Sequence, residues 1–220
     1  MKLFYLSLSL IFFFIPFSIL GETMSDLIWN NGLYYKKGSK TPFDGIVDGE
    51  INGSFINGKK HGKWTRYYKK GSKTPFHGIV TGEINGSFIN GKKHGKWTRY
   101  YNNGRMFSIS NYYLGLKNGS FITFSENGQF IEKGKYKNNL EDGLWLRFFE
   151  NGKINYKGKF INGKKTGVWF GYYYNGQLEY KGSFKNGKKD GIWEFYSSNG
   201  MKYNEFPGVY KNGNKISKAL

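Results

Sequence analysis

The sequence predicts an all-β protein, built from tandem β-hairpin repeats that form one elongated, twisted antiparallel meander. Three observations predict this fold: a fixed spacing of tryptophans, an alternation of apolar and polar residues, and a high density of Asn-Gly pairs. A fixed period over much of a chain is typical of repeat architectures, in which each unit packs on its neighbours. We therefore expect one long domain.

The tryptophans set the period. Trp169 and Trp193 each follow the preceding tryptophan by 24 residues, and Trp97 lies 48 residues before Trp145. Phe121 occupies the position that this spacing would give to a tryptophan. We expect these aromatic residues to be structural markers that pack between units. The markers are Trp64, Trp97, Phe121, Trp145, Trp169 and Trp193.

Each unit contains two expected strands. Residues 154–160 alternate between apolar and polar side chains, as do residues 178–184, and period-2 alternation indicates a strand with one buried face. Gly134, Gly158 and Gly182 lie inside these strands, where glycine is normally weakening. We expect a neighbouring aromatic ring to lie over each of these glycines, which have no Cβ.

Asn-Gly pairs predict the turns. The chain contains fourteen of them, from Asn31-Gly32 to Asn212-Gly213. Both central residues of a type I′ hairpin turn need a positive φ, which Asn and Gly adopt more readily than other residues. The pairs therefore predict two-residue hairpin turns and argue against helix.

The first 21 residues differ from the rest. Lys2 is followed by an apolar run from Leu3 to Leu20, which indicates an export signal. The run is also about long enough to cross a bilayer. We therefore expect residues 1–21 to be a signal peptide or an N-terminal membrane anchor of an exported protein, in the periplasm, at the cell surface or secreted. The chain has no cysteine, which excludes disulfides and attachment through a lipobox.

The remainder divides into a linker, a repeat array and a short tail. These are residues 22–32, 33–216 and 217–220. Within the array, residues 34–66 and 67–99 are identical except at two positions, Asp44 against His77 and Asp48 against Thr81. The period of this duplication is 33 residues, which is a 24-residue unit with a nine-residue insertion. Near-identity of the two copies indicates a recent duplication.

The chain is strongly basic, with a formal net charge of +19. Pairs of lysines follow the expected turns, and successive turns on one edge of a sheet lie about 10 Å apart, or two strand spacings. We therefore expect a comb of paired lysines that attracts an acidic protein, an anionic lipid or a wall polymer. A plainer interpretation is that lysine protects exposed strand edges from aggregation. The lysines are Lys59, Lys60, Lys92, Lys93, Lys164, Lys165, Lys188 and Lys189.

No catalytic or metal-binding pattern stands out. His61, His77 and His94 lie in tandem repeats without cysteine or acidic companions, and the glycines belong to turns. We therefore expect a non-enzymatic protein without cofactor or metal. The export signal, the small number of arginines and the use of aromatic rings for packing argue against nucleic acid as the partner. The oligomeric state stays open.

The residues Tyr156, Gly158, Gly163 and Gly167 resemble the pattern of the MORN repeat. The ending Gly167-Val168-Trp169 resembles the bacterial MORN-2 variant, and residues 34–45 resemble a module of YwqK-family antitoxins. This resemblance implies a protein-interaction scaffold, with an antitoxin- or immunity-like role and a toxin-like or acidic partner protein.

A second resemblance leads to a different function. Residues 95–106 are also similar to choline-binding or glucan-binding wall repeats, which hold ligands on Trp and Tyr rings. It implies a module that binds the cell wall, and the comb of lysines adds an anionic membrane surface as a further alternative. The period of 24 residues and the Tyr-x-Gly-x-Phe strand favour the MORN-2 variant.

Overall fold

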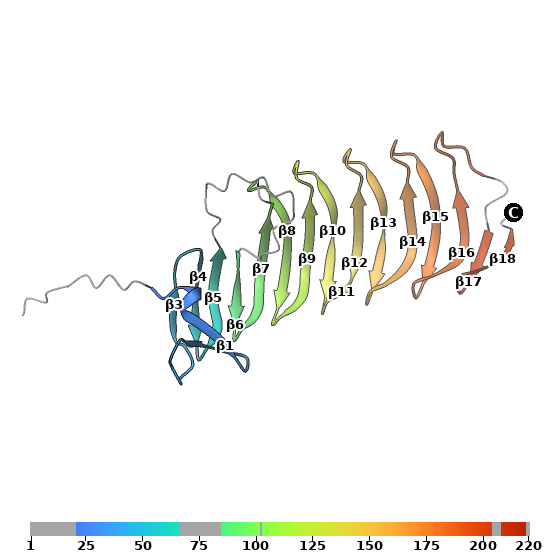
Figure 1. The fold of residues 1–220 in the computed structure, drawn as a ribbon. Coiled ribbons are helices and arrows are strands. Elements are labelled where there is room, and N and C mark those ends of the chain that lie inside the picture. The colour runs from blue at the N-terminus through green and yellow to red at the C-terminus, as the bar shows by residue number, and fades with distance from the viewer. Residues whose placement is uncertain (1–20, 67–84, 102, 204–207, 219–220) are drawn as a thin grey trace, which may run out of the picture.

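The computed structural model describes residues 21–66, 85–101, 103–203 and 208–218. In these residues the protein is nearly all β-strand and contains no α-helix. One antiparallel sheet of 16 strands dominates, and its strands lie side by side in chain order from β3 to β18 (Figure 1). The predicted all-β meander of tandem hairpins is confirmed.

Most strands of the sheet have five to nine residues and pair with the strands before and after them. The exception is the short strand β11, which lies outside this order and pairs with β10. The strands are β3 (Gly45–Val47), β4 (Ile51–Ile56), β5 (Lys59–Arg66), β6 (Asn85–Ile89), β7 (Lys92–Tyr100), β8 (Met106–Tyr113), β9 (Leu116–Phe124), β10 (Phe130–Lys137), β11 (Leu140–Glu141), β12 (Gly143–Phe148), β13 (Ile154–Ile161), β14 (Lys164–Tyr172), β15 (Leu178–Lys185), β16 (Lys188–Phe195), β17 (Gly208–Lys211) and β18 (Asn214–Lys218).

A row of alternating tryptophan and glycine crosses the sheet. Trp169 is fully buried, and its ring lies over Gly158, where a Cβ would come 2.1 Å from the indole Cδ2. Its backbone pairs on the other side with Gly182, which lies under the next tryptophan. Glycine is therefore needed here for space. The same contact joins Gly53 to Trp64, Gly86 to Trp97, Gly134 to Trp145 and Gly182 to Trp193.

A bulge in β14 lies just before Trp169. Lys159 pairs with Thr166 and Lys157 pairs with Phe170, so β14 has two more residues than β13 between these pairs. Gly167 lies in the longer segment with a φ of +62°, a conformation that glycine adopts without steric cost. The bulge brings Trp169 above Gly158.

Phenylalanine and tyrosine rings fill the spaces between the tryptophans. The ring of Trp169 lies 5.0 Å from that of Phe160 and 5.8 Å from that of Phe184, both in edge-to-face geometry. Such pairs are favoured by the charge distribution of aromatic rings. We call the side of the sheet that carries the tryptophans the ring face. The core of the array is this single layer of rings.

The segment before the array is folded. β1 (Leu27–Asn30) and β2 (Leu33–Lys36) form a separate hairpin, preceded by a 3₁₀ turn at Met24–Asp26. Leu27 is buried in a cluster with Val47, Phe55 and Trp64. The linker predicted for residues 22–32 is therefore wrong, because an apolar side chain of this segment covers the first unit.

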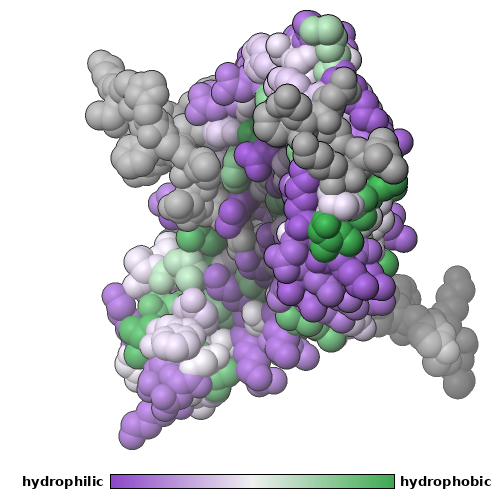
Figure 2. Space-filling view, turned by 90° about the vertical axis from the view of Figure 1, so that its right-hand side faces the viewer, coloured by the Kyte–Doolittle hydropathy of each residue, from purple (hydrophilic) through white to green (hydrophobic). Residues whose placement is uncertain are grey.

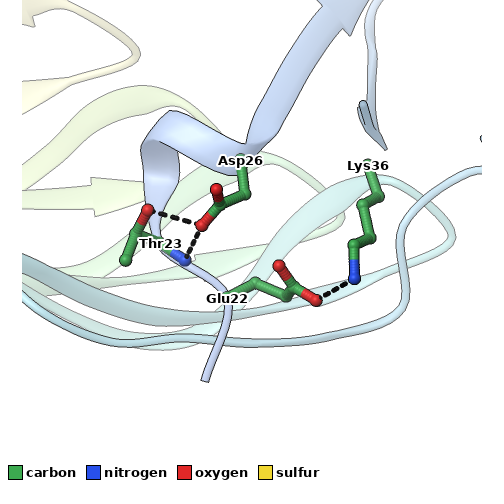
Figure 3. A network of polar contacts seen from close by, with 4 residues as sticks. All are labelled: Glu22, Thr23, Asp26 and Lys36. Atoms are coloured by element: carbon green, nitrogen blue, oxygen red, sulfur yellow. Dashed lines mark hydrogen bonds and ion pairs between the residues drawn. The ribbon is translucent and has the colours of Figure 1, made fainter. Parts of the chain in front are cut away.

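Polar contacts hold the same segment in place (Figure 3). The carboxylate of Asp26 accepts hydrogen bonds from the backbone N–H and the hydroxyl of Thr23, at 2.8 and 2.6 Å. These hydrogen bonds lower the pKa of Asp26. Lys36 forms an ion pair with Glu22, and Glu22 bridges to Val47 of β3. The chain is thus fixed to the first strand of the sheet.

Of the other predicted boundaries, the structure changes the start of the tail and does not cover the leader. β18 continues to Lys218 and pairs with β17, so the tail predicted for residues 217–220 begins too early. The expected leader, apart from Gly21, and residues 67–84 of the duplication lie outside the described residues. Within the described ranges, no helix is long and apolar enough to cross a membrane.

The two edges of the sheet have different turns. On one edge, Asn162 and Gly163 both have positive φ, 48° and 73°, as predicted for a two-residue turn. On the other edge, as in the pair Asn151-Gly152, only the glycine has positive φ, and the N–H of Phe149 donates to the carbonyl of Lys153 around a three-residue loop. The prediction of two-residue turns is therefore correct for one edge of the sheet and wrong for the other. Three Asn-Gly pairs lie inside strands: Asn52-Gly53, Asn85-Gly86 and Asn118-Gly119.

Candidate functional site

The lysine pairs lie at the edge that carries the two-residue turns, which we call the lysine edge. They are the first two residues of β5, β7, β14 and β16, and not turn residues. Because successive side chains of a strand point to opposite faces, each pair is divided between the two faces. The predicted comb of paired lysines is therefore two rows of single lysines.

The second lysine of each pair covers the ring face. The Nζ atoms of Lys165 and Lys189 lie 4.3 and 4.2 Å from the ring centroids of Trp169 and Trp193. Burial lowers the pKa of both ammonium groups. Lys60 and Lys93 lie in the same way over Trp64 and Trp97, at 4.4 and 5.1 Å. A cation over an indole face is attracted by the ring, so these four half-buried lysines cover the tryptophan layer from the solvent side.

The first lysine of each pair is exposed. Backbone hydrogen bonds between successive turns keep these lysines in line: the N–H of Gly187 donates to the carbonyl of Lys165, and the N–H of Gly213 to that of Lys189, both at 2.9 Å. The N–H of Gly91 donates to the carbonyl of Lys60 at 2.8 Å. Consecutive hairpins are thereby locked together at this edge. The exposed lysines are Lys59, Lys92, Lys164 and Lys188.

The exposed row is interrupted in the middle of the array. Leu116 and Leu140 occupy the position of the first lysine in β9 and β11, and both are exposed. The lysine edge thus has two positive ends. The sequence reasoning missed Lys117, whose Nζ lies 4.9 and 4.7 Å from the ring centroids of Phe121 and Tyr136. The signal in the sequence is its position two residues after the turn Leu114-Gly115, which is the position of the second lysine of each pair.

Each repeat of this geometry is one hairpin that begins at the lysine edge and returns to it. Four stretches of the chain match the MORN repeat variant. They are residues 93–112, 117–138, 141–162 and 165–186. The matched MORN variant segments correspond to the hairpins β7–β8, β9–β10, β12–β13 and β14–β15. The comparison with curated proteins gave no match.

Further hairpins repeat the geometry of the MORN variant beyond the matched segments. Trp64 on β5 and Trp193 on β16 lie over glycines like the tryptophans of the matched units. MORN repeats commonly bind proteins or membranes and are generally non-catalytic, which agrees with a repeat scaffold. The resemblance to YwqK-family antitoxins stays a hypothesis.

The histidines do not come together. His61 and His94 occupy equivalent positions in β5 and β7, where they pair with Ser54 and Ser87. Two strand spacings separate them, or about 10 Å. His77 lies outside the described residues. In the part of the chain that the structure describes, no group of three or more His, Cys, Asp or Glu residues could hold a metal ion.

Proposed function

We propose that this protein is a non-enzymatic repeat scaffold that binds an acidic partner protein along the lysine edge, in an antitoxin- or immunity-like role. The observation that carries the proposal is the exposed lysines at the two ends of the lysine edge, which the hydrogen bonds between turns hold in fixed order. A net charge of +19 reinforces the local field and would steer an acidic partner toward the protein.

The burial of the rings favours the lysine edge over the ring face. The tryptophans of the repeats are buried, so their faces are not open for stacking on sugars or bases. This burial argues against binding of wall sugars or nucleic acid through these rings. Seen from its C-terminal side, the surface is mostly hydrophilic, with hydrophobic residues scattered among the polar ones (Figure 2).

An anionic membrane surface is the second candidate. Leu144, Val168 and Ile192 immediately precede buried tryptophans, and 59%, 45% and 60% of their surface is exposed. Adjacent strand residues face opposite sides, so these apolar side chains lie on the face away from the rings. Exposed apolar residues together with lysines suit a surface of anionic lipids.

The proposal includes export, for which the apolar run before Gly21 is the motivation. Mass spectrometry of the native protein is expected to find an N-terminus near Glu22 in a fraction outside the cytoplasm. An intact Met1 in the membrane fraction would make the protein an anchored one. A full-length soluble cytoplasmic form would contradict export.

The partner is tested with two variants of equal charge. In the edge variant, glutamine replaces the four exposed lysines Lys59, Lys92, Lys164 and Lys188. In the control variant, glutamine replaces four exposed lysines in the middle of strands or hairpins, Lys63, Lys96, Lys159 and Lys181. Each protein is immobilised and incubated with envelope extract. We expect the unaltered protein and the control variant to retain the same acidic protein, and the edge variant to lose it.

Salt provides an independent check. Between 50 and 500 mM salt the Debye length falls from roughly 14 to 4 Å, so association of the unaltered protein should slow steeply and approach that of the edge variant. Equal recovery of the partner by the edge and control variants would show that the lysine edge takes no part. Recovery of lipid or wall polymer alone would replace the protein-binding proposal with the surface-binding one.

A further inference from the structure

The ring face has a hollow where β8 and β9 carry residues that differ from those of the regular units. A cavity of about 210 Å³ lies over the middle strands β7, β8 and β9. Trp97, Ser110 and Phe121 are cross-strand partners in it. A second row beside them consists of Arg99, Ser108 and Thr123. The cavity is thus built on two rows of three residues.

Two smaller residues in place of large ones create this space: a serine for a tyrosine, and a phenylalanine for a tryptophan. Ser108 occupies the position of Tyr156 in β13, and Ser110 occupies that of Gly158, as their cross-strand partners show. Phe121 stands where other units have tryptophan, and its ring packs on those of Tyr136 and Trp145, at 5.2 and 5.8 Å. A phenyl ring that packs on the following unit leaves the two serines uncovered by an indole. The hollow therefore follows from particular residues of this chain.

The lining combines rings, hydroxyls and two cations. Ser108 and Ser110 form the floor and are only 5% and 9% exposed. Arg99 and Lys117, which also have contacts within the protein, bring positive charge, and none of the described residues that line the cavity is a carboxylate. The remaining lining residues are Trp97, Phe107, Tyr112, Phe121 and Thr123.

We propose that this cavity binds a small aromatic anion, a flat ring that carries a carboxylate or a phosphate group. Its ring would lie among the aromatic side chains, where apolar area is removed from water. Its anionic group would accept hydrogen bonds from the guanidinium of Arg99 and from the serine hydroxyls, since a guanidinium suits both carboxylate and phosphate. The site is separate from the lysine edge, so it does not depend on the proposed partner.

Binding is measured by calorimetry with benzoate and phenyl phosphate as probes. Benzyl alcohol serves as the neutral control and inorganic phosphate as the control without a ring. We expect one of the two aromatic anions to bind, and both controls to bind at least about tenfold more weakly, as loss of a charge-assisted contact or of ring burial implies. All binding measurements use the protein with its whole repeat array.

Two variants test the location. Ser108→Tyr, Ser110→Gly and Phe121→Trp together restore the residues of the regular units, including the glycine that an overlying indole requires, and should fill the cavity, abolishing binding while the protein stays folded. Arg99→Gln should weaken binding about tenfold or more. Arg147→Gln is the matched control, because Arg147 follows Trp145 as Arg99 follows Trp97 but does not line the cavity. It should leave binding unchanged.

Several results would overturn the proposal. It fails if neither aromatic anion binds, if benzyl alcohol or inorganic phosphate binds as tightly as they do, or if Arg99→Gln binds like Arg147→Gln. Circular dichroism verifies that the filled variant is folded. If that variant is unfolded, the comparison of the two arginine variants decides.

Discussion

At the residue scale, the array depends on pairs of residues that require each other. A glycine in one strand makes room for the indole of the next, and a lysine covers that indole from the solvent side. Neither part is stable alone: interior glycine weakens a strand, and an uncovered tryptophan exposes apolar area. The repeated Gly-Trp-Lys set lets a single-layered sheet bury rings without a second layer.

The glycine contact can be tested in a double-mutant cycle. Gly158→Ala would place a Cβ 2.1 Å from the ring of Trp169, and we expect it to lower the free energy of unfolding by about 1–3 kcal/mol, as overpacking does. Trp169→Ala should cost about 3 kcal/mol, toward the low end for buried aromatic residues. With Trp169 already replaced by alanine, Gly158→Ala should cost almost nothing. Urea unfolding measures all four proteins, and additive effects would contradict the packing role of Gly158.

A tyrosine near the middle of the array predicts sensitivity to alkali. Burial, followed by the charges of Glu141 and Glu132, raises the pKa of Tyr136 to about 12. In unfolded chains tyrosine loses its proton near pH 10, so between about pH 10 and 12 the folded state holds a proton that the unfolded state has lost. Stability should therefore fall as pH rises through this range.

The variant Tyr136→Phe isolates this effect. We expect its free energy of unfolding to fall less steeply between about pH 10 and 12 than that of the unaltered protein. The lysines of lowered pKa titrate in both proteins, so their contribution cancels in the difference. Urea unfolding at several pH values supplies the two slopes. Parallel slopes would contradict the burial of the Tyr136 hydroxyl.

At the scale of the element, the Asn-Gly pair stabilises the turns of the two edges in different ways. In the turns of the lysine edge, asparagine itself adopts positive φ, as at Asn162. In the loops of the opposite edge, the asparagine side chain carries the structure. The Oδ1 of Asn151 accepts a hydrogen bond from the N–H of Lys153 at 3.0 Å, and its Nδ2 donates to the carbonyl of Tyr174 in the next loop at 2.8 Å.

Glycine and alanine substitutions should separate the two functions. Asn162→Gly should leave stability nearly unchanged, whereas Asn162→Ala should lower it by about 1 kcal/mol, because alanine tolerates positive φ poorly. At Asn151 both substitutions should cost about 1–2 kcal/mol, since each removes the side-chain hydrogen bonds. Thermal and urea unfolding of the four variants measure the pattern. Rescue by glycine at Asn151 would show that its side chain is dispensable.

At the scale of the whole molecule, stability is distributed along a line. Each hairpin contacts mainly the hairpin before it and the one after it, as in other repeat proteins. The N-terminal end is closed by Leu27 and the β1–β2 hairpin. Units can therefore be lost or gained as long as whole hairpins are kept and the end remains covered.

The duplication provides the test. Deleting residues 34–66 joins Leu33 to residues 67–99, whose sequence differs from the deleted copy at only two positions. We expect a folded protein with the same downstream pairing. Deleting residues 47–66 instead removes Val47, β4 and β5 and should disrupt the N-terminal unit. Far-ultraviolet circular dichroism and thermal unfolding compare the two, and equal behaviour would contradict the modular organisation.

The sequence alone determined the repeat period, the strand content, the residues that mark each unit and the absence of disulfides. These properties are readable because alternation, glycine and Asn-Gly pairs act through local backbone preferences. The expectation that Gly158 needs an aromatic neighbour also followed from a local anomaly, since glycine in a strand requires a reason.

Only the tertiary structure decided which lysine of each pair covers a ring and which stays exposed, because the pairs begin the strands and the bulge at Gly167 brings the following tryptophan into place. Likewise, the cavity over Ser108 and Ser110 depends on which residues of three strands lie opposite one another. The folding of residues 22–32 depends on the buried contact of Leu27 with residues from three other strands. Contacts of this kind join residues distant in the chain, and local preferences do not determine them.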